Sequence, residues 1–150
     1  MALEIVLNMV CSFVGVMLFG ALFNVPRKYY LGSGLTGLVG WMGYYFAAFR
    51  FSTAFSAFIS AALIAMMGRI LAVKMKAPIT IFVIPGLFPL VPGISIYQSV
   101  YNLVIEESEK AAKYGLDAFK VALGIALGII FVLNLPGKWF TLHNKKKGGR

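Results

Sequence analysis

Residues 85 to 98 of the chain read PGLFPLVPGISIYQ, and this stretch decides the fold. It lies inside an apolar segment, 79 to 105, that is long enough to cross a bilayer, because a spanning helix needs about 20 apolar residues. Pro85, Pro89 and Pro92 each lack the backbone N–H that an α-helix requires, and each ring crowds the carbonyl one turn earlier. The segment is therefore predicted to cross the membrane as a broken helix.

The composition of the whole chain indicates a membrane protein. Of its 150 residues, 60% are hydrophobic and 13% are charged, whereas a soluble domain carries about a quarter charged residues. The Lys and Arg residues that give the net charge of +9 lie beside apolar runs and in a basic tail rather than on a polar face. We therefore expect no nucleic acid partner. We expect one transmembrane domain over residues 1–150, surrounded by lipid in the cell membrane.

Five apolar segments are predicted to be spanning helices, which makes the expected fold all-α. Their approximate bounds are 5–23, 31–49, 53–73, 79–105 and 118–135. Cytoplasmic connections carry most Lys and Arg residues, and the cations here predict an outer N-terminus and a basic cytoplasmic tail at 138–150. If the broken segment is re-entrant instead, the tail moves outside, against this rule.

Small residues at helical spacing predict close packing between these helices, as is usual in lipid. They lie on the second, third and last predicted spans. These are Gly32, Thr36 and Gly40, then Ala57, Ala61 and Ala65, then Gly124 and Gly128.

The break also predicts a functional site. Irregular backbone at membrane depth leaves carbonyl groups that need partners, and each unsatisfied group costs several kcal/mol. Transporters place such breaks at their solute sites, and neutral polar groups follow the break in this chain. The candidate substrate-binding or gating residues are Pro85, Pro89, Pro92, Gly93, Ser95, Tyr97, Gln98, Asn102 and Asn24. The alternative is a structural kink whose polar groups fasten it to neighbouring helices.

Two further sets of residues have competing interpretations. Asn24 and Asn134 lie near the cytoplasmic ends of the first and last predicted spans, where they either contribute to a gate or cap the helices. Capping is the commoner role. Trp41, Tyr44 and Tyr45 are interpreted as interfacial anchors together with Arg50.

The reactive residue types argue against an enzyme. The sole histidine, His143, lies in the basic tail and the sole cysteine, Cys11, in the first apolar run, so we expect no Ser/His dyad, metal site or cofactor. Carboxylates approach the predicted spans only near their ends, at Glu4 and Asp117. If export is proton-driven, a partner chain should supply the buried acid.

Three short motifs resemble a known family. They are FNVP at 23–26, PLVPGISIY at 89–97, and PG at 136–137 before the basic tail. Together they are similar to the threonine/serine exporters, in particular the small YjjB-type subunit that corresponds to the C-terminal half of the fused exporters. The resemblance implies export of threonine and serine, or of dicarboxylates such as succinate, by two dissimilar subunits.

The leading hypothesis is therefore an exporter subunit that pairs with a second, larger membrane subunit. An odd number of spans puts the two ends on opposite sides, so a related five-span partner would form an inverted repeat with this chain. Homo-oligomerisation is also compatible with the glycine stripes. The competing hypothesis is a non-transporting scaffold or assembly subunit.

Overall fold

The computed structural model describes residues 2–136, and within this range it contains helices and no strands, which confirms the all-α prediction. The predicted basic tail at 138–150 lies outside the described residues. The elements are α1 (Ala2–Leu22), η1 (Arg27–Tyr29), α2 (Tyr30–Ala48), α3 (Thr53–Met75), α4 (Thr80–Leu87), η2 (Phe88–Leu90), α5 (Gly93–Val104) and α6 (Ser108–Leu133).

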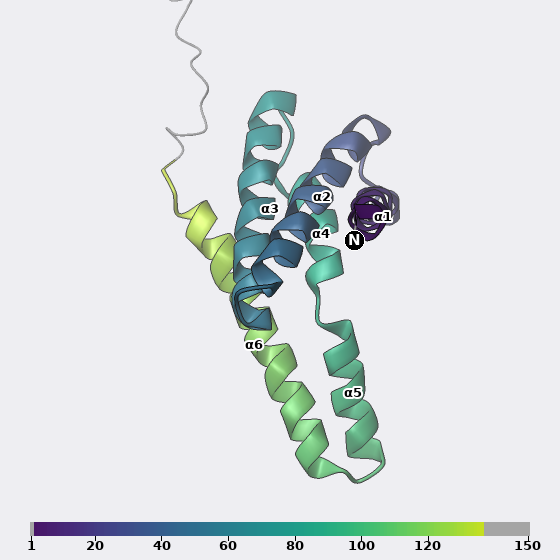
Figure 1. Ribbon diagram of the computed structural model, residues 1–150. Coiled ribbons are helices and arrows are strands. Elements are labelled where there is room, and N and C mark those ends of the chain that lie inside the picture. The colour runs from purple at the N-terminus through teal and green to yellow at the C-terminus, as the bar shows by residue number, and fades with distance from the viewer. Residues whose placement is uncertain (1, 137–150) are drawn as a thin grey trace, which may run out of the picture.

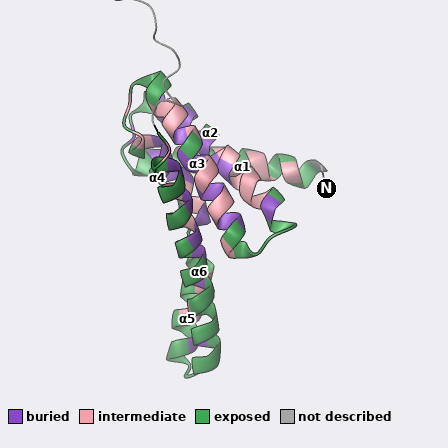
Figure 2. Cartoon of the chain, turned by 90° about the vertical axis from the view of Figure 1, so that its left-hand side faces the viewer, coloured by how far each residue is buried: buried purple, intermediate pink, exposed green. Residues whose placement is uncertain are grey.

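Helix α3 lies at the centre of the packing, between α2 and α6 (Figure 1). Helix α1 packs on α2, and α4 packs against both α2 and α3. Helix α5 contacts α6, and the two form a hairpin that projects beyond the other helices (Figure 1). Figures 1 and 2 show α1 running across the direction of α3 and α6.

The helices in residues 2–136 support a multi-pass membrane protein but a smaller count of spans than predicted. Three are long and apolar enough to cross a bilayer, within α1, α3 and α6. The pair formed by 80–90 and α5, bent by 49°, makes a fourth if it is one span. Helix α2 falls short because its glycines and tyrosines lower its hydropathy. Five crossings and their orientation stay a prediction.

The small-residue stripes pack helix against helix, as predicted. A Cβ added to Gly128 of α6 would lie 2.5 Å from the carbonyl oxygen of Phe58 in α3, and one added to Gly124 would meet the carbonyl oxygen of Ala54. The facing α3 residues Ala57 and Ala61 are fully buried. The backbones of α3 and α6 can approach this closely only because these side chains are absent or small.

Helix α2 uses glycines on several sides, because three helices pack around it. A Cβ at Gly32 would lie 2.7 Å from the Phe82 ring of α4. One at Gly37 would overlap Val16 of α1, and one at Gly40 would overlap Ile64 of α3. The same glycines that lower the hydropathy of α2 therefore allow α1, α3 and α4 to pack closely against it.

Three helices end on a residue with positive φ: Asn24 (53°), Lys76 (50°) and Glu106 (64°). After Asn24, the Val25 N–H donates to the Gly20 carbonyl at 2.9 Å, and the Asn24 N–H donates to Ala21 at 3.1 Å. This is the Schellman arrangement, in which asparagine tolerates the left-handed conformation better than most residues. This geometry agrees with a capping role for Asn24.

The end of α6 is capped by side chains. Asn134 donates from its side-chain amide to the Ile130 carbonyl at 2.9 Å, which agrees with a capping role. Arg69 of α3 donates from Nη1 to the carbonyls of Val132 at 2.7 Å and Leu135 at 2.8 Å. A cation at a helix C-terminus is stabilised by the helix dipole as well as by these hydrogen bonds.

The contact between α3 and α6 predicts that Gly128→Ala destabilises the protein by about 1–3 kcal/mol, because the backbone of Phe58 cannot rotate away from the new methyl group. Gly15→Ala is the matched control, since nothing lies within 4 Å of a Cβ there, and it should be neutral or stabilising by about 0.5–1 kcal/mol. Thermal unfolding in lipid nanodiscs measures both. Equal losses of stability for the two variants would contradict this packing.

Candidate functional site

The first proline of the broken segment is fastened to α2. Pro85 lies inside α4, and its missing N–H leaves the Ile81 carbonyl without its usual donor. Ser33 of α2 donates from Oγ to this carbonyl at 3.1 Å. Thr36, one turn later on α2, donates to the carbonyl of Phe82 at 3.0 Å. At this proline the structure agrees with the interpretation of a kink fastened to a neighbouring helix.

The second and third prolines end the helix. The chain first tightens into 3-10 geometry, in which the N–H of Phe88 donates to Pro85 and that of Val91 donates to Phe88 at 3.2 Å. It then becomes extended at Val91, with ψ at 128°, and α5 begins at Gly93. The predicted break is therefore present, between residues 90 and 93.

A cavity of about 220 Å³ lies at this break. Its lining combines the broken backbone with side chains of α2, α3 and α6, and none of the lining residues is charged. The first turn of α5 contributes backbone N–H groups that have no partner within the helix. The lining residues are Trp41, Tyr44, Thr53, Pro89, Leu90, Val91, Pro92, Gly93, Ile94, Ser95 and Val121.

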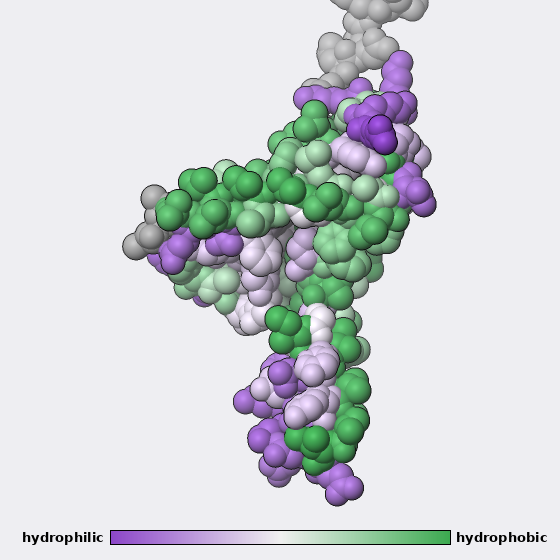
Figure 3. Space-filling view, turned by 90° about the vertical axis from the view of Figure 1, so that its right-hand side faces the viewer, coloured by the Kyte–Doolittle hydropathy of each residue, from purple (hydrophilic) through white to green (hydrophobic). Residues whose placement is uncertain are grey.

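A second cavity, of about 270 Å³, adjoins the first under α1. The two cavities share Trp41 and Pro89 as lining residues. From α1 the second cavity receives Asn8 and Ser12, which are polar residues within a strongly apolar helix, and also the exposed Cys11. Figure 3 shows pale, weakly polar surface beneath α1 and above the projecting hairpin.

The structure brings Asn24 and Pro85 together at a separate place. Both line a cavity of about 270 Å³ between the end of α1 and α4. This cavity has no lining residue in common with the one at the break. The candidate residues therefore fall at two places along the broken segment.

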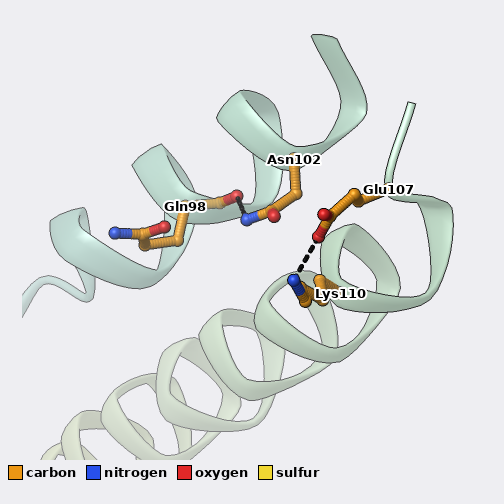
Figure 4. Close-up of polar contacts among 4 residues, drawn as sticks. All are labelled: Gln98, Asn102, Glu107 and Lys110. Carbon is orange, nitrogen blue, oxygen red and sulfur yellow. Dashed lines mark hydrogen bonds and ion pairs between the residues drawn. The ribbon is translucent and has the colours of Figure 1, made fainter. Parts of the chain in front are cut away.

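The remaining candidates lie in the hairpin. Asn102 is buried and donates from its side chain to the Gln98 carbonyl at 2.6 Å, close to the ion pair of Glu107 and Lys110 (Figure 4). Tyr97 is 63% exposed. The cavity at the break is not lined by Tyr97, Gln98 or Asn102. Of the candidate polar residues that follow the break, only Ser95 lines that cavity.

The structure adds Trp41, Tyr44 and Thr53 to the site. The two aromatic residues were expected to anchor α2 at the membrane surface, but they line the cavity with their rings stacked at 5.9 Å and 23°. Their spacing of three residues indicates a shared helix face. Sequence alone does not reveal that the broken segment packs opposite this face.

Comparison with known proteins decides the family. The family model described as Threonine/Serine exporter, ThrE, matches residues 8–134, which include both adjoining cavities. The chain belongs to the threonine/serine exporter family. Members are membrane exporters, which fits the expectation that the chain is not an enzyme. Among residues 2–136, no group of His, Cys, Asp or Glu side chains is arranged to hold a metal ion.

One relative in the threonine/serine exporter family shows how the lengths compare. The chain is 27% identical over 109 residues to the threonine/serine exporter of Corynebacterium glutamicum. The aligned region covers 73% of this chain and 21% of that protein. The chain thus spans about a fifth of the length of this relative. No solved structure matches the chain.

The hydrogen bond from Ser33 Oγ to the Ile81 carbonyl predicts that Ser33→Ala destabilises the protein by about 1–3 kcal/mol, because the substitution removes the donor of this partly buried carbonyl. Ser12→Ala is the control, since the Ser12 hydroxyl bonds only to Met9 in its own helix. Thermal unfolding of both variants in nanodiscs compares them. If Ser33→Ala unfolds no earlier than Ser12→Ala, the bond does not support the bent segment.

The cavity under α1 predicts that Cys11 reacts with a charged, membrane-impermeant thiosulfonate, because the reactive thiolate forms in water and not in lipid. The Cys11→Ser variant, which contains no cysteine, gives the background level of modification. Leu18→Cys in that background is the control for a lipid-facing position on α1, because Leu18 is 63% exposed. Mass spectrometry measures the modified fraction. Equally slow modification at both positions would show that this cavity holds no water.

Proposed function

We propose that this chain is a subunit of an exporter of small hydrophilic metabolites, of the threonine and serine type, and that its solute path passes through the cavity at the broken segment. The observation that carries the proposal is the cavity itself, which is lined by Pro89, Pro92, Gly93 and Ser95. Irregular backbone at membrane depth is tolerated where it lines a wet cavity. Membership in the exporter family supports the same conclusion.

The cavity suits one carboxylate better than two. The first turn of α5 offers the backbone N–H groups of Ile94 and Ser95, since the Gly93 N–H already donates to the Val91 carbonyl at 2.7 Å. It also offers the positive end of a helix dipole, and transporters use such helix ends to bind carboxylates. The hydroxyls of Thr53 and Ser95 add neutral hydrogen-bonding groups. The lining contains no Lys or Arg for a second carboxylate, so threonine and serine are favoured over dicarboxylates such as succinate.

The size of the cavity points in the same direction. Sites for drug-sized ligands occupy about 300–1,000 Å³, whereas this cavity occupies about 220 Å³. A solute of few heavy atoms, such as serine or threonine, suits a space of this size. Motion of α5 relative to α4 at the break would open the cavity to either side in turn.

We propose a single transmembrane domain with five crossings, an outer N-terminus and a cytoplasmic C-terminus. It works with a second, larger membrane subunit, or with a second copy of itself. The lining of the cavity at the break contains no carboxylate, so a proton-coupled exporter would take its buried acid from that partner. Large apolar side chains are exposed along α1, which supports contact with lipid or a partner.

A non-transporting scaffold is the second candidate. The hydrogen bonds from Ser33 and Thr36 to α4 support it, because they fasten the segment around Pro85 to a neighbouring helix. A scaffold would use the glycine faces to hold other helices and would leave the cavity at the break unused.

Efflux measurements separate the two candidates. The chain is expressed with the product of the neighbouring gene, and the initial rate of threonine efflux from preloaded cells is compared among variants at matched membrane abundance. We expect Pro92→Ala and Ser95→Ala each to lower the rate about tenfold, which corresponds to roughly 1.4 kcal/mol. Tyr97→Phe, outside the cavity, should leave it unchanged. Unchanged efflux in all three variants would favour the scaffold.

A further inference from the structure

The aromatic pair on α2 is the feature of the cavity that the proposed path leaves without a role. Trp41 and Tyr44 are half-buried, stack on each other and line the same cavity as the first turn of α5. We infer that this pair binds the ammonium group of the transported solute and thereby selects amino acids over the hydroxy acids of the same shape. The inference rests on the proposed function and deepens it.

The charges around the cavity lead to this assignment. A zwitterion carries an ammonium group into a space whose lining contains no Asp or Glu. Such a group must still replace its lost hydration, since an unpaired charge is costly away from water. The faces of tryptophan and tyrosine rings attract cations, and tryptophan does so most strongly. Trp41 and Tyr44 are the aromatic residues in this lining.

The arrangement also separates the two ends of the solute. The N–H groups that suit a carboxylate belong to α5, whereas the aromatic rings belong to α2. An amino acid fits both sets at once, while a hydroxy acid fits only the first. Trp41 also lines the adjoining cavity under α1, so a solute that binds its ring lies where the two cavities meet.

The interpretation of these residues as membrane anchors makes a different prediction. An anchoring tryptophan or tyrosine sits at the headgroup level and stabilises the position of its helix. Its loss would lower the amount of protein in the membrane without changing which solutes bind. Selectivity at matched abundance therefore distinguishes the two roles.

The fluorescence of Trp41 can report the binding of a solute beside its ring. The chain contains two tryptophans, at 41 and 139, so Trp139→Phe leaves Trp41 as this chain's only indole fluorophore. The full chain, co-purified with its partner subunit in nanodiscs, is titrated with serine and with glycerate, in which a hydroxyl replaces the ammonium group. We expect a saturable change in the fluorescence with serine and at least tenfold weaker binding of glycerate.

Selectivity is then measured without fluorescence, by displacement of radiolabelled serine. Trp41→Leu and Tyr44→Leu should each lower the preference for serine over glycerate at least fivefold, and Trp41→Phe, which keeps a ring, should retain most of it. Tyr45→Leu is the control, because Tyr45 does not line the cavity. If the preference survives in both leucine variants, the assignment of this pair is wrong.

The outcomes also separate this inference from the proposed function. Equal binding of serine and glycerate in the parent protein overturns the ammonium site and leaves a path for carboxylates intact. Absence of any saturable binding, together with unchanged efflux in Ser95→Ala, overturns both.

Discussion

The structure depends on one constraint, the supply of hydrogen-bond donors around three prolines in an apolar segment. Backbone carbonyls in lipid cannot turn to water, so each needs a donor from protein or from a wet cavity. Pro85 is accommodated without ending the helix, because Ser33 replaces the missing donor at Ile81. Around Pro89 and Pro92 the chain instead tightens, ends the helix and starts a new one at Gly93. The first solution keeps α4 continuous, and the second gives both the 49° bend and the cavity.

The glycines of α2 make it possible for α4 to accommodate Pro85 in this way. A hydroxyl on a short side chain can reach the backbone of another helix only when the two helices lie very close. Gly32 admits the ring of Phe82, and a Cβ at Gly86 of α4 would lie 3.0 Å from Oγ1 of Thr36. Small residues on both helices therefore bring α2 and α4 near enough for Ser33 and Thr36 to donate. Packing and hydrogen bonding are thus one arrangement in this part of the chain.

Much of the fold, including the break in the fourth apolar segment, could be predicted from sequence, because these features depend on local chemistry. The break follows from the proline spacing, the stripes from glycine and alanine periodicity, and the cap at Asn24 from its position before Pro26. The partner of each helix face could not be predicted. Ser99 of α5, for example, donates to the Ala111 carbonyl of α6 at 2.8 Å, a contact that the sequence does not indicate. Nor does the sequence reveal that Trp41 and Tyr44 line the cavity at the break.

The central claim is that water reaches the break between η2 and α5. The amides of Ile94 and Ser95, in the first turn of α5, test it most directly, because a helix gives them no internal partner. Hydrogen–deuterium exchange of the assembled complex in nanodiscs compares them with the amides of Ala61 and Ile64 in the buried part of α3. The account predicts that the amides of α5 exchange within seconds while those of α3 stay protected for hours. Protection of Ile94 and Ser95 as strong as that of α3 would mean a dry, sealed break and would contradict it.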